Sequence, residues 1–267
     1  MAEQKIRLGG MALVNGVLVH GPTSWACAVR TADGRLEVVA ERKRVIGSSL
    51  RAPLLRGPAR LVEAFAFLPR VKRAVPEAVF PFEGRRMLGA LAASAAAAQV
   101  VRRGRLGDST KEFVTALLSL APAVLSLREG ALAAYHGAEH IAIGTYEHDE
   151  PRAREHERCG THLVGPLLLT TAVANTVASR APARYRAAAR VGAAVAAVGT
   201  STELFGWMQR HPDSPVARAL AKPGHEFQHR VATAEPTPEQ LEVAEAALAA
   251  CLELETKEAN ARDVSAR

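Results

Sequence analysis

The chain has 267 residues, of which 48% are hydrophobic and only 4% aromatic, and its formal net charge is +7. This length allows one large domain or two small ones, each with a buried core. The positive charge favours anionic partners such as an acidic membrane surface. The basic residues are scattered and few aromatic rings are available to stack on bases, so we expect no specific nucleic-acid partner. Three widely spaced cysteines favour a reducing compartment over a disulfide framework.

The first part of the chain has the pattern of β structure, over residues 9–46. Asn15-Gly16 lies between apolar pairs, which is the strongest short-range hairpin signal. A second turn is predicted at Ala32-Asp33-Gly34, where glycine suits a positive φ. We therefore predict a small antiparallel subdomain of three or four strands within residues 1–50. Because an isolated hairpin is marginally stable in water, this sheet must pack on the helical part.

The remainder, residues 51–267, is predicted to form a helical domain, so the fold class is α+β and predominantly α-helical. Thr237-Pro238-Glu239-Gln240 predicts the start of a C-terminal helix that docks on the core, with threonine as N-cap and glutamine closing the capping box. Four runs of fifteen to seventeen almost uncharged residues precede it, at 87–101, 113–127, 163–179 and 191–207.

These four runs are intermediate between two classes of helix. A membrane span needs about 20 apolar residues, whereas runs of about 10–14 are more often buried core helices. Alanine, which is abundant in the runs, contributes little to membrane insertion, and the flanking lysines and arginines select no orientation. The residues alone therefore favour the helical core of a water-soluble protein over a membrane-embedded bundle.

The middle of the chain carries Tyr135-His136-Gly137-Ala138-Glu139-His140 after an alanine- and leucine-rich run, which predicts a helix. His136 and His140 would then lie one turn apart on the same face. His-x-x-Glu-His is the reversed zinc-hydrolase motif, in which two histidines bind metal and the glutamate, here Glu139, is the general base. Tyr135 could stabilise developing negative charge nearby. The alternative is a pair of surface histidines on an ordinary helix.

The surrounding residues favour the metal interpretation. Five of the nine histidines fall within residues 136–162, together with Cys159 and six carboxylates. Zinc accepts nitrogen, sulfur and oxygen ligands in tetrahedral arrangements. We expect His136 and His140 to bind a divalent metal, with zinc as the preferred ion. Glu203, or else Cys159 or His156, would complete the set of ligands.

Glu203 stands out because it interrupts the apolar run 191–207. An ionised carboxylate is costly in such a place unless it is paired or bound to metal. In reversed zinc-hydrolase sites a glutamate well downstream on another helix supplies the third ligand, and Glu203 could take this place. The alternative is an ion pair with Arg190 or Arg210.

Several motifs, in the same order along the chain, resemble those of the bacterial DUF1385 family. They are the central motif followed by Arg158-Cys159-Gly160-Thr161, the opening segment 9–22, Arg56-Gly57 with Glu63, and Thr233-Ala234-Glu235-Pro236 with 240–244. The resemblance implies a multi-pass membrane protein and a metal-dependent enzyme, although the family has no settled activity. Asn15 stands where the family has glutamate, and His20 where it has arginine. If the family's pair supports the site, these replacements bear on catalysis in this chain.

We therefore expect a metal-dependent enzyme, a hydrolase of unknown substrate, at the cell membrane, with a cytoplasmic location as the alternative. The rival hypothesis is a non-catalytic, membrane-associated scaffold or adaptor in which the histidine-rich stretch holds a structural metal. A structural site is normally closed by four protein ligands, whereas a catalytic site keeps a position for water. A basic RNA-associated protein is a weaker third hypothesis, which steep salt dependence of binding would reveal.

Overall fold

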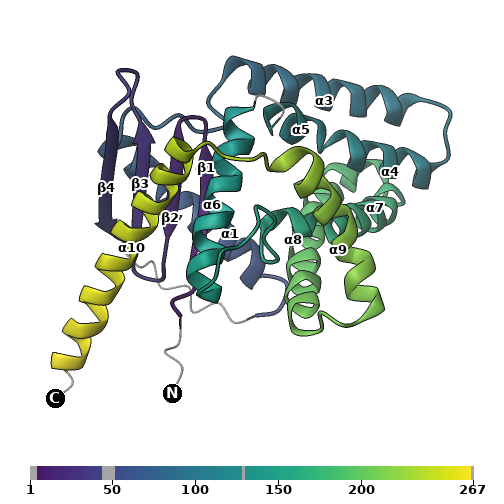
Figure 1. Cartoon of the computed structure of the whole chain (residues 1–267). Helices are drawn as coiled ribbons and strands as arrows, with labels where there is room; N and C mark the ends of the chain where they lie inside the picture. The colour runs from purple at the N-terminus through teal and green to yellow at the C-terminus, as the bar shows by residue number, and fades with distance from the viewer. Residues whose placement is uncertain (1–4, 44–51, 128–129, 266–267) are drawn as a thin grey trace.

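In the computed structural model, which describes residues 5–43, 52–127 and 130–265, the chain begins with a four-stranded antiparallel sheet (Figure 1). Each strand pairs with the next, so the spatial order is the chain order. The strands are β1 (Gly9–Leu13), β2 (Gly16–His20), β3 (Ser24–Arg30) and β4 (Leu36–Arg42). The predicted sheet is confirmed. The predicted domain boundary between residues 50 and 51 lies outside the described residues, and the division into two domains stays a prediction.

The two predicted turns are both present, although the first is displaced by one residue. Leu13 pairs with Gly16, so the loop between β1 and β2 is Val14-Asn15. A side chain on Gly16 would lie 2.1 Å from the carbonyl oxygen of Ala28. Gly16 is therefore needed for close approach of β3, not for a positive φ. Gly34 has a φ of +82° and fulfils the turn role predicted for it.

Helices form most of the remaining described residues, as predicted. They are α1 (Arg56–Ala66), α2 (Leu68–Ala74), α3 (Arg85–Arg103), α4 (Asp108–Leu118), α5 (Ala121–Leu127), α6 (Ala131–His148), α7 (Val164–Ser179), α8 (Arg186–Arg210), α9 (Pro215–Phe227) and α10 (Pro238–Ser265), with short helical turns η1 (Gly160–Leu163), η2 (Ala183–Tyr185) and η3 (Gln228–Ala232).

Both faces of the sheet are covered by helices. One face packs on α6 and α10 through alternate strand residues, which are Ala12, Val17, Val19, Ala26 and Ala28. The other face packs on α2 and the segment after it through Leu13, Leu18, Trp25, Cys27 and Val29. Strand side chains alternate between faces, so each strand contributes to both cores. Figure 1 shows α10 lying across the sheet and α6 beside β1.

The remaining helices form a second layer on the α6 side, in which α7 packs on α8 and α4, and α3 packs on α4 and α5 (Figure 1). Many large apolar side chains of this layer face outwards, among them Leu88, Val100, Phe113, Val173, Val177 and Val191. Two stretches, Asp108–Leu127 and Gly160–Ser179, are long and apolar enough to span a membrane, and only 22% of each is buried. By length and composition, these two stretches could cross a bilayer.

Glu255 anchors α10 to the sheet at the β2–β3 connection. Its carboxylate accepts hydrogen bonds from the backbone N–H and the hydroxyl of both Thr23 and Ser24, at 2.7–2.8 Å. Burial by itself raises the pKa of Glu255, but the bonds from Ser24 and Thr23 outweigh burial and leave the pKa below its usual value. A buried carboxylate that accepts several bonds from N–H and O–H groups stabilises the fold in its ionised form.

Replacing this carboxylate by an amide is expected to destabilise the protein. Glu255→Gln should lower the free energy of unfolding by about 2 kcal/mol at neutral pH, because charge-assisted hydrogen bonds are lost. The folded-state pKa lies below the unfolded one, so this contribution exists above the ordinary carboxyl pKa and disappears as pH falls through the folded-state value. Urea unfolding at neutral pH and near pH 3 measures the change.

Glu253→Gln is the matched control, because Glu253 lies on the same helix and forms an exposed pair with Lys257. It should leave the free energy of unfolding nearly unchanged. Equal destabilisation by the two substitutions would contradict the anchoring role of Glu255.

Candidate metal centre

The helix α6 presents its two motif histidines on one face, as predicted. The ring centroids of His136 and His140 are 4.3 Å apart, with the ring planes at 59° to each other. Backbone from other segments approaches this helix closely: a side chain at Gly137 would lie 2.2 Å from the carbonyl oxygen of Ala234. The glycine of the motif therefore admits the chain that runs past the two imidazoles.

Each imidazole is oriented by a backbone carbonyl. The Nδ1 atom of His136 lies 2.8 Å from the oxygen of Ala232, and the Nδ1 atom of His140 lies 2.6 Å from the oxygen of Arg154. A carbonyl oxygen only accepts hydrogen bonds, so each Nδ1 carries the proton and donates it. Both Nε2 atoms then keep a free lone pair. This arrangement, in which the second ring nitrogen is held by a carbonyl, is typical of metal-binding histidines.

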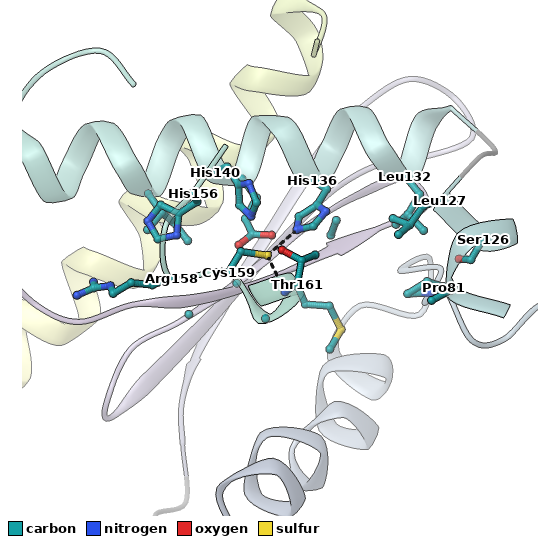
Figure 2. Close-up of a pocket in the computed structure, with 18 of the residues that line it drawn as sticks. Pro81, Ser126, Leu127, Leu132, His136, His140, His156, Arg158, Cys159 and Thr161 are labelled. Atoms are coloured by element: carbon teal, nitrogen blue, oxygen red, sulfur yellow. Dashed lines mark hydrogen bonds between the residues drawn. The ribbon is translucent and has the colours of Figure 1, made fainter. Parts of the chain in front are cut away.

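Cys159 brings a sulfur atom to the same place from the other side (Figure 2). Its Sγ lies 3.5 Å from Nε2 of His136 and accepts a bond from the N–H of Thr161 at the start of η1. One ligand atom from each of His136, His140 and Cys159 lies within 4.8 Å of the others, and these three residues are called the converging group below. Burial raises the pKa of the Cys159 thiol. Two imidazole nitrogens and a sulfur are donors that suit zinc, so these residues fit the predicted ion.

Glu139 lies in the same cavity wall, at 7% exposure. A side chain at Gly10 would approach within 2.2 Å of its Oε1, so the carboxylate packs against the backbone of β1. Burial raises the pKa of Glu139 to about 7, with His136 acting against the rise and Cys159 adding to it. Burial also lowers the pKa of His140 to about 2, which keeps the imidazole in its neutral, ligating form. Among described residues, no side chain or backbone group is hydrogen-bonded to the Glu139 carboxylate.

The other predicted site residues lie at different distances from this group. The ring of His156 is 5.5 Å from that of His140, and its Nε2 contacts a carboxylate oxygen of Glu147 at 3.1 Å. His156 therefore lines the cavity but is not one of the three converging donors. Tyr135 packs in the core between α6 and the sheet, and it is not among the residues that line the cavity.

Glu203 is paired elsewhere in the structure. Both of its carboxylate oxygens contact the guanidinium of Arg56, one of them at 2.6 Å from Nε. Arg56 lies at the start of α1, and a side chain on Gly57 would collide with Thr202 of α8. The Arg56-Gly57 motif thus joins α1 to α8. The structure does not bring Glu203 to the two histidines. Its ion-pair partner is Arg56, whereas Arg190 pairs with Glu112 and Arg210 contributes only a more distant electrostatic interaction.

The two departures from the family pattern contact residues outside the converging group. The side-chain amide of Asn15 holds the segment after α2, accepting a bond from the N–H of Val79 at 3.0 Å. His20 contacts Lys43 through Nδ1 at 2.9 Å and packs edge-on against Phe67. Neither side chain touches a residue of the converging group.

Several positioning groups could not be found from the sequence motifs. The carbonyls of Arg154 and Ala232 belong to the backbone, which leaves no residue-type signal. Gln228 is fully buried and joins η3 to the segment before η1: its Oε1 accepts from the N–H of His156 at 2.7 Å, and its Nε2 donates to Oγ1 of Thr161 at 2.6 Å. It therefore fixes the segment that carries Cys159.

The converging group lines a cavity of about 530 Å³ (Figure 2). Its walls come from β1, α5, α6, the segment at Pro81 and Phe82, and the stretch that includes Cys159. Most of the lining is apolar, and its polar residues include His136, Glu139, His140 and Cys159, with Ser126, His156, Arg158 and Thr161. An apolar cavity with a few convergent polar groups is the usual form of a ligand-binding or active site.

Comparisons with known proteins match this region of the chain. Residues 130–254 match the family model described as "Protein of unknown function (DUF1385)". The "Uncharacterized protein YqhQ" of Bacillus subtilis is 24% identical over 294 residues, which cover 91% of this chain and 92% of that protein. No solved structure matches. The matched range includes His136, His140 and Cys159, and together the two matches support the assignment of this chain to the DUF1385 family.

Proposed function

We propose that the protein is a metal-dependent hydrolase associated with a membrane. The observation that carries this proposal is the convergence of two carbonyl-oriented imidazoles and one sulfur at the wall of an apolar cavity. These three donors favour zinc. Three protein ligands would leave a position for water or substrate on a bound zinc ion, which is the pattern of catalytic zinc rather than structural zinc.

Glu139 is the proposed general base. Zinc held by His136, His140 and Cys159 would make water more acidic and polarise a carbonyl oxygen. Glu139 lies beside the ligands and has no described partner, so its carboxylate is available to accept a proton from water. Tyr135 is packed in the core, so we assign it no part in the reaction.

The outward-facing apolar side chains favour membrane association. The core helix of a water-soluble protein is mostly buried, whereas the two candidate spans are 22% buried. An excess of seven positive charges suits an anionic membrane surface as the partner.

The rival function is a structural metal site in a non-catalytic scaffold, which would need a fourth protein ligand. His156 is a further candidate that lines the cavity, but Glu147 and the side chain of Gln228 hold it in place. These contacts of His156 favour a metal site with three protein ligands and one position open to water.

Metal content distinguishes ligands from neighbours. Purified His136→Ala should lose bound zinc, because one of three donors is removed, while Glu139→Gln should keep it. His148→Ala is the control, since His148 lies on the same helix and bonds only to the carbonyl of Gly144. Elemental analysis of the purified proteins gives the result, and equal zinc in wild type and His136→Ala would remove the site.

The role of Glu139 is tested with p-nitrophenyl acetate as a general carbonyl probe. Glu139→Gln should slow its zinc-dependent hydrolysis by about a hundredfold, as expected on removing a general base. In cobalt-substituted wild type, acetohydroxamate should alter the visible spectrum because one position is open. An unchanged spectrum, with no hydrolysis, would support the structural site instead.

Glu203→Gln distinguishes a metal ligand from an ion-pair partner. We expect it to keep its zinc and to unfold at a lower temperature, since the pair that joins α8 to Arg56 of α1 is weakened. Arg56→Gln should have the same effect. Loss of zinc from Glu203→Gln alone would restore Glu203 as a ligand.

Gln228→Ala tests whether the Cys159 segment is prepositioned. Loss of its bonds to His156 and Thr161 should weaken zinc affinity roughly tenfold, a typical effect of removing an outer partner of a metal site. Gln209→Ala is the control, because Gln209 also bonds to this segment, at the carbonyl of Glu157, but from an exposed position. Competition with a coloured chelator measures both affinities, and equal effects would contradict the role of Gln228.

A further inference from the structure

Within the described residues, the outer edge of β1 has no strand partner, since β1 stands at the end of the sheet. Leu8 and the strand residues Gly9 to Ala12 all line the cavity that contains the metal-binding group. An edge strand with free N–H and C=O groups is a template for pairing with another extended chain. In this structure the template lies inside a candidate active site.

The direction of the free groups follows from the pairing of β1 with β2. Leu13 and Gly16 close the two-residue loop and therefore direct their backbone groups towards each other. Successive residues of a strand direct their backbone groups to opposite edges, so the groups of Ala12 and Gly10 point outwards. Just beyond the strand, the N–H of Val14 donates to the carbonyl of Val79 at 2.9 Å. Apart from the β1–β2 pairing, no described residue is hydrogen-bonded to the backbone of either.

The carboxylate of Glu139, the proposed general base, lies next to this edge. Gly10 is the residue against which the Glu139 carboxylate packs, so a chain paired with Gly10 and Ala12 passes beside Glu139. Neighbouring strands lie about 4.8 Å apart, which places such a chain within the cavity. The surrounding side chains are apolar, including Phe82, Met87 and Ile143. The cavity also shares Pro81, Met87, Ser126 and Leu132 with a second apolar cavity of about 620 Å³.

We infer that the substrate is an extended, apolar polypeptide segment that adds to β1 as a fifth strand, continuing the edge pairing that Val79 begins. Main-chain hydrogen bonds to Gly10 and Ala12 supply affinity, and the two cavities take alternate side chains. Binding depends on the edge and the two cavities and needs no metal, whereas cleavage rests on the proposed function. In cleavage, the oxygen of water bonds to the amide carbon and its proton passes to Glu139. The C–N bond then breaks as the amine nitrogen takes that proton.

The ligand side of this inference is tested with a fluorescent octapeptide of leucine and valine, flanked by serine. Its counterpart carries a methyl group on every backbone nitrogen, which keeps the side chains and removes every backbone donor. The full-length protein in detergent micelles should bind the N-methylated peptide more weakly by roughly tenfold or more, because two or more hydrogen bonds are lost. Equal or tighter binding of the N-methylated peptide would mean a merely apolar groove and would overturn the proposal.

The protein side is tested at Ala12, whose outward N–H proline would remove while the bonds to β2 remain. Ala12→Pro should weaken binding of the unmethylated peptide roughly fivefold, and Ala12→Ser, which keeps the N–H, should bind like wild type. Zinc content and circular dichroism check that Ala12→Pro is folded, and if it is not, the N-methyl comparison decides. Unchanged binding by folded Ala12→Pro would refute pairing at this edge.

His136→Ala separates this inference from the proposed function. It should lose zinc and still bind the octapeptide in preference to its N-methylated counterpart, since no backbone group of β1 is changed. If wild type holds no zinc but discriminates between the two peptides, the hydrolase proposal fails and the edge proposal stands. If zinc is present and neither peptide binds, the edge proposal fails and the hydrolase proposal stands.

Discussion

The candidate site depends on two hydrogen bonds that hold the imidazoles of His136 and His140 by their Nδ1 atoms. The accepting carbonyls come from Ala232 and Arg154, which belong to segments that pass α6 on their way to other elements. With the Nδ1 atoms engaged, both Nε2 atoms keep a lone pair without a change of tautomer, and one donor atom of each histidine lies within 4.8 Å of Sγ of Cys159. An exposed pair of histidines would need to give up rotamer freedom before binding an ion, and here folding has already imposed that restriction.

The cavity lies where two differently built halves of the molecule meet. The sheet, with α6 and α10, has tightly packed cores on both faces. The layer of α3, α4, α7 and α8 leaves large apolar side chains outside. An apolar substrate would therefore approach the converging group from the side of the α3, α4, α7 and α8 layer. Glu139, which packs beside β1, belongs to the half that contains the sheet, α6 and α10.

Local patterns in the sequence were sufficient for the sheet, for the helical remainder and for the histidine pair, because each depends on neighbours within about one turn or one hairpin. Cys159 was recognisable as a candidate by its residue type. The position of Glu203 was not predictable, since its partner Arg56 is 147 residues away and only tertiary packing joins them. The turn at Asn15 lies one residue earlier than predicted for a similar reason. Gly16 packs closely against Ala28 of another strand, so it belongs to β2 and not to the turn.

The closeness of backbone to α6 has a consequence for interpreting sequence variation. Any residue larger than glycine at position 137 would meet the oxygen of Ala234, and any at position 10 would meet Glu139. Natural variants should thus be rejected at Gly137 as strictly as at the histidines, although this glycine offers no reactive atom, whereas a side chain at position 10 would require only that the Glu139 side chain move. Invariance along this motif would therefore have two causes, steric exclusion at the glycine and chemistry at the histidines. They are distinguished by measuring both metal content and folding of the same variant.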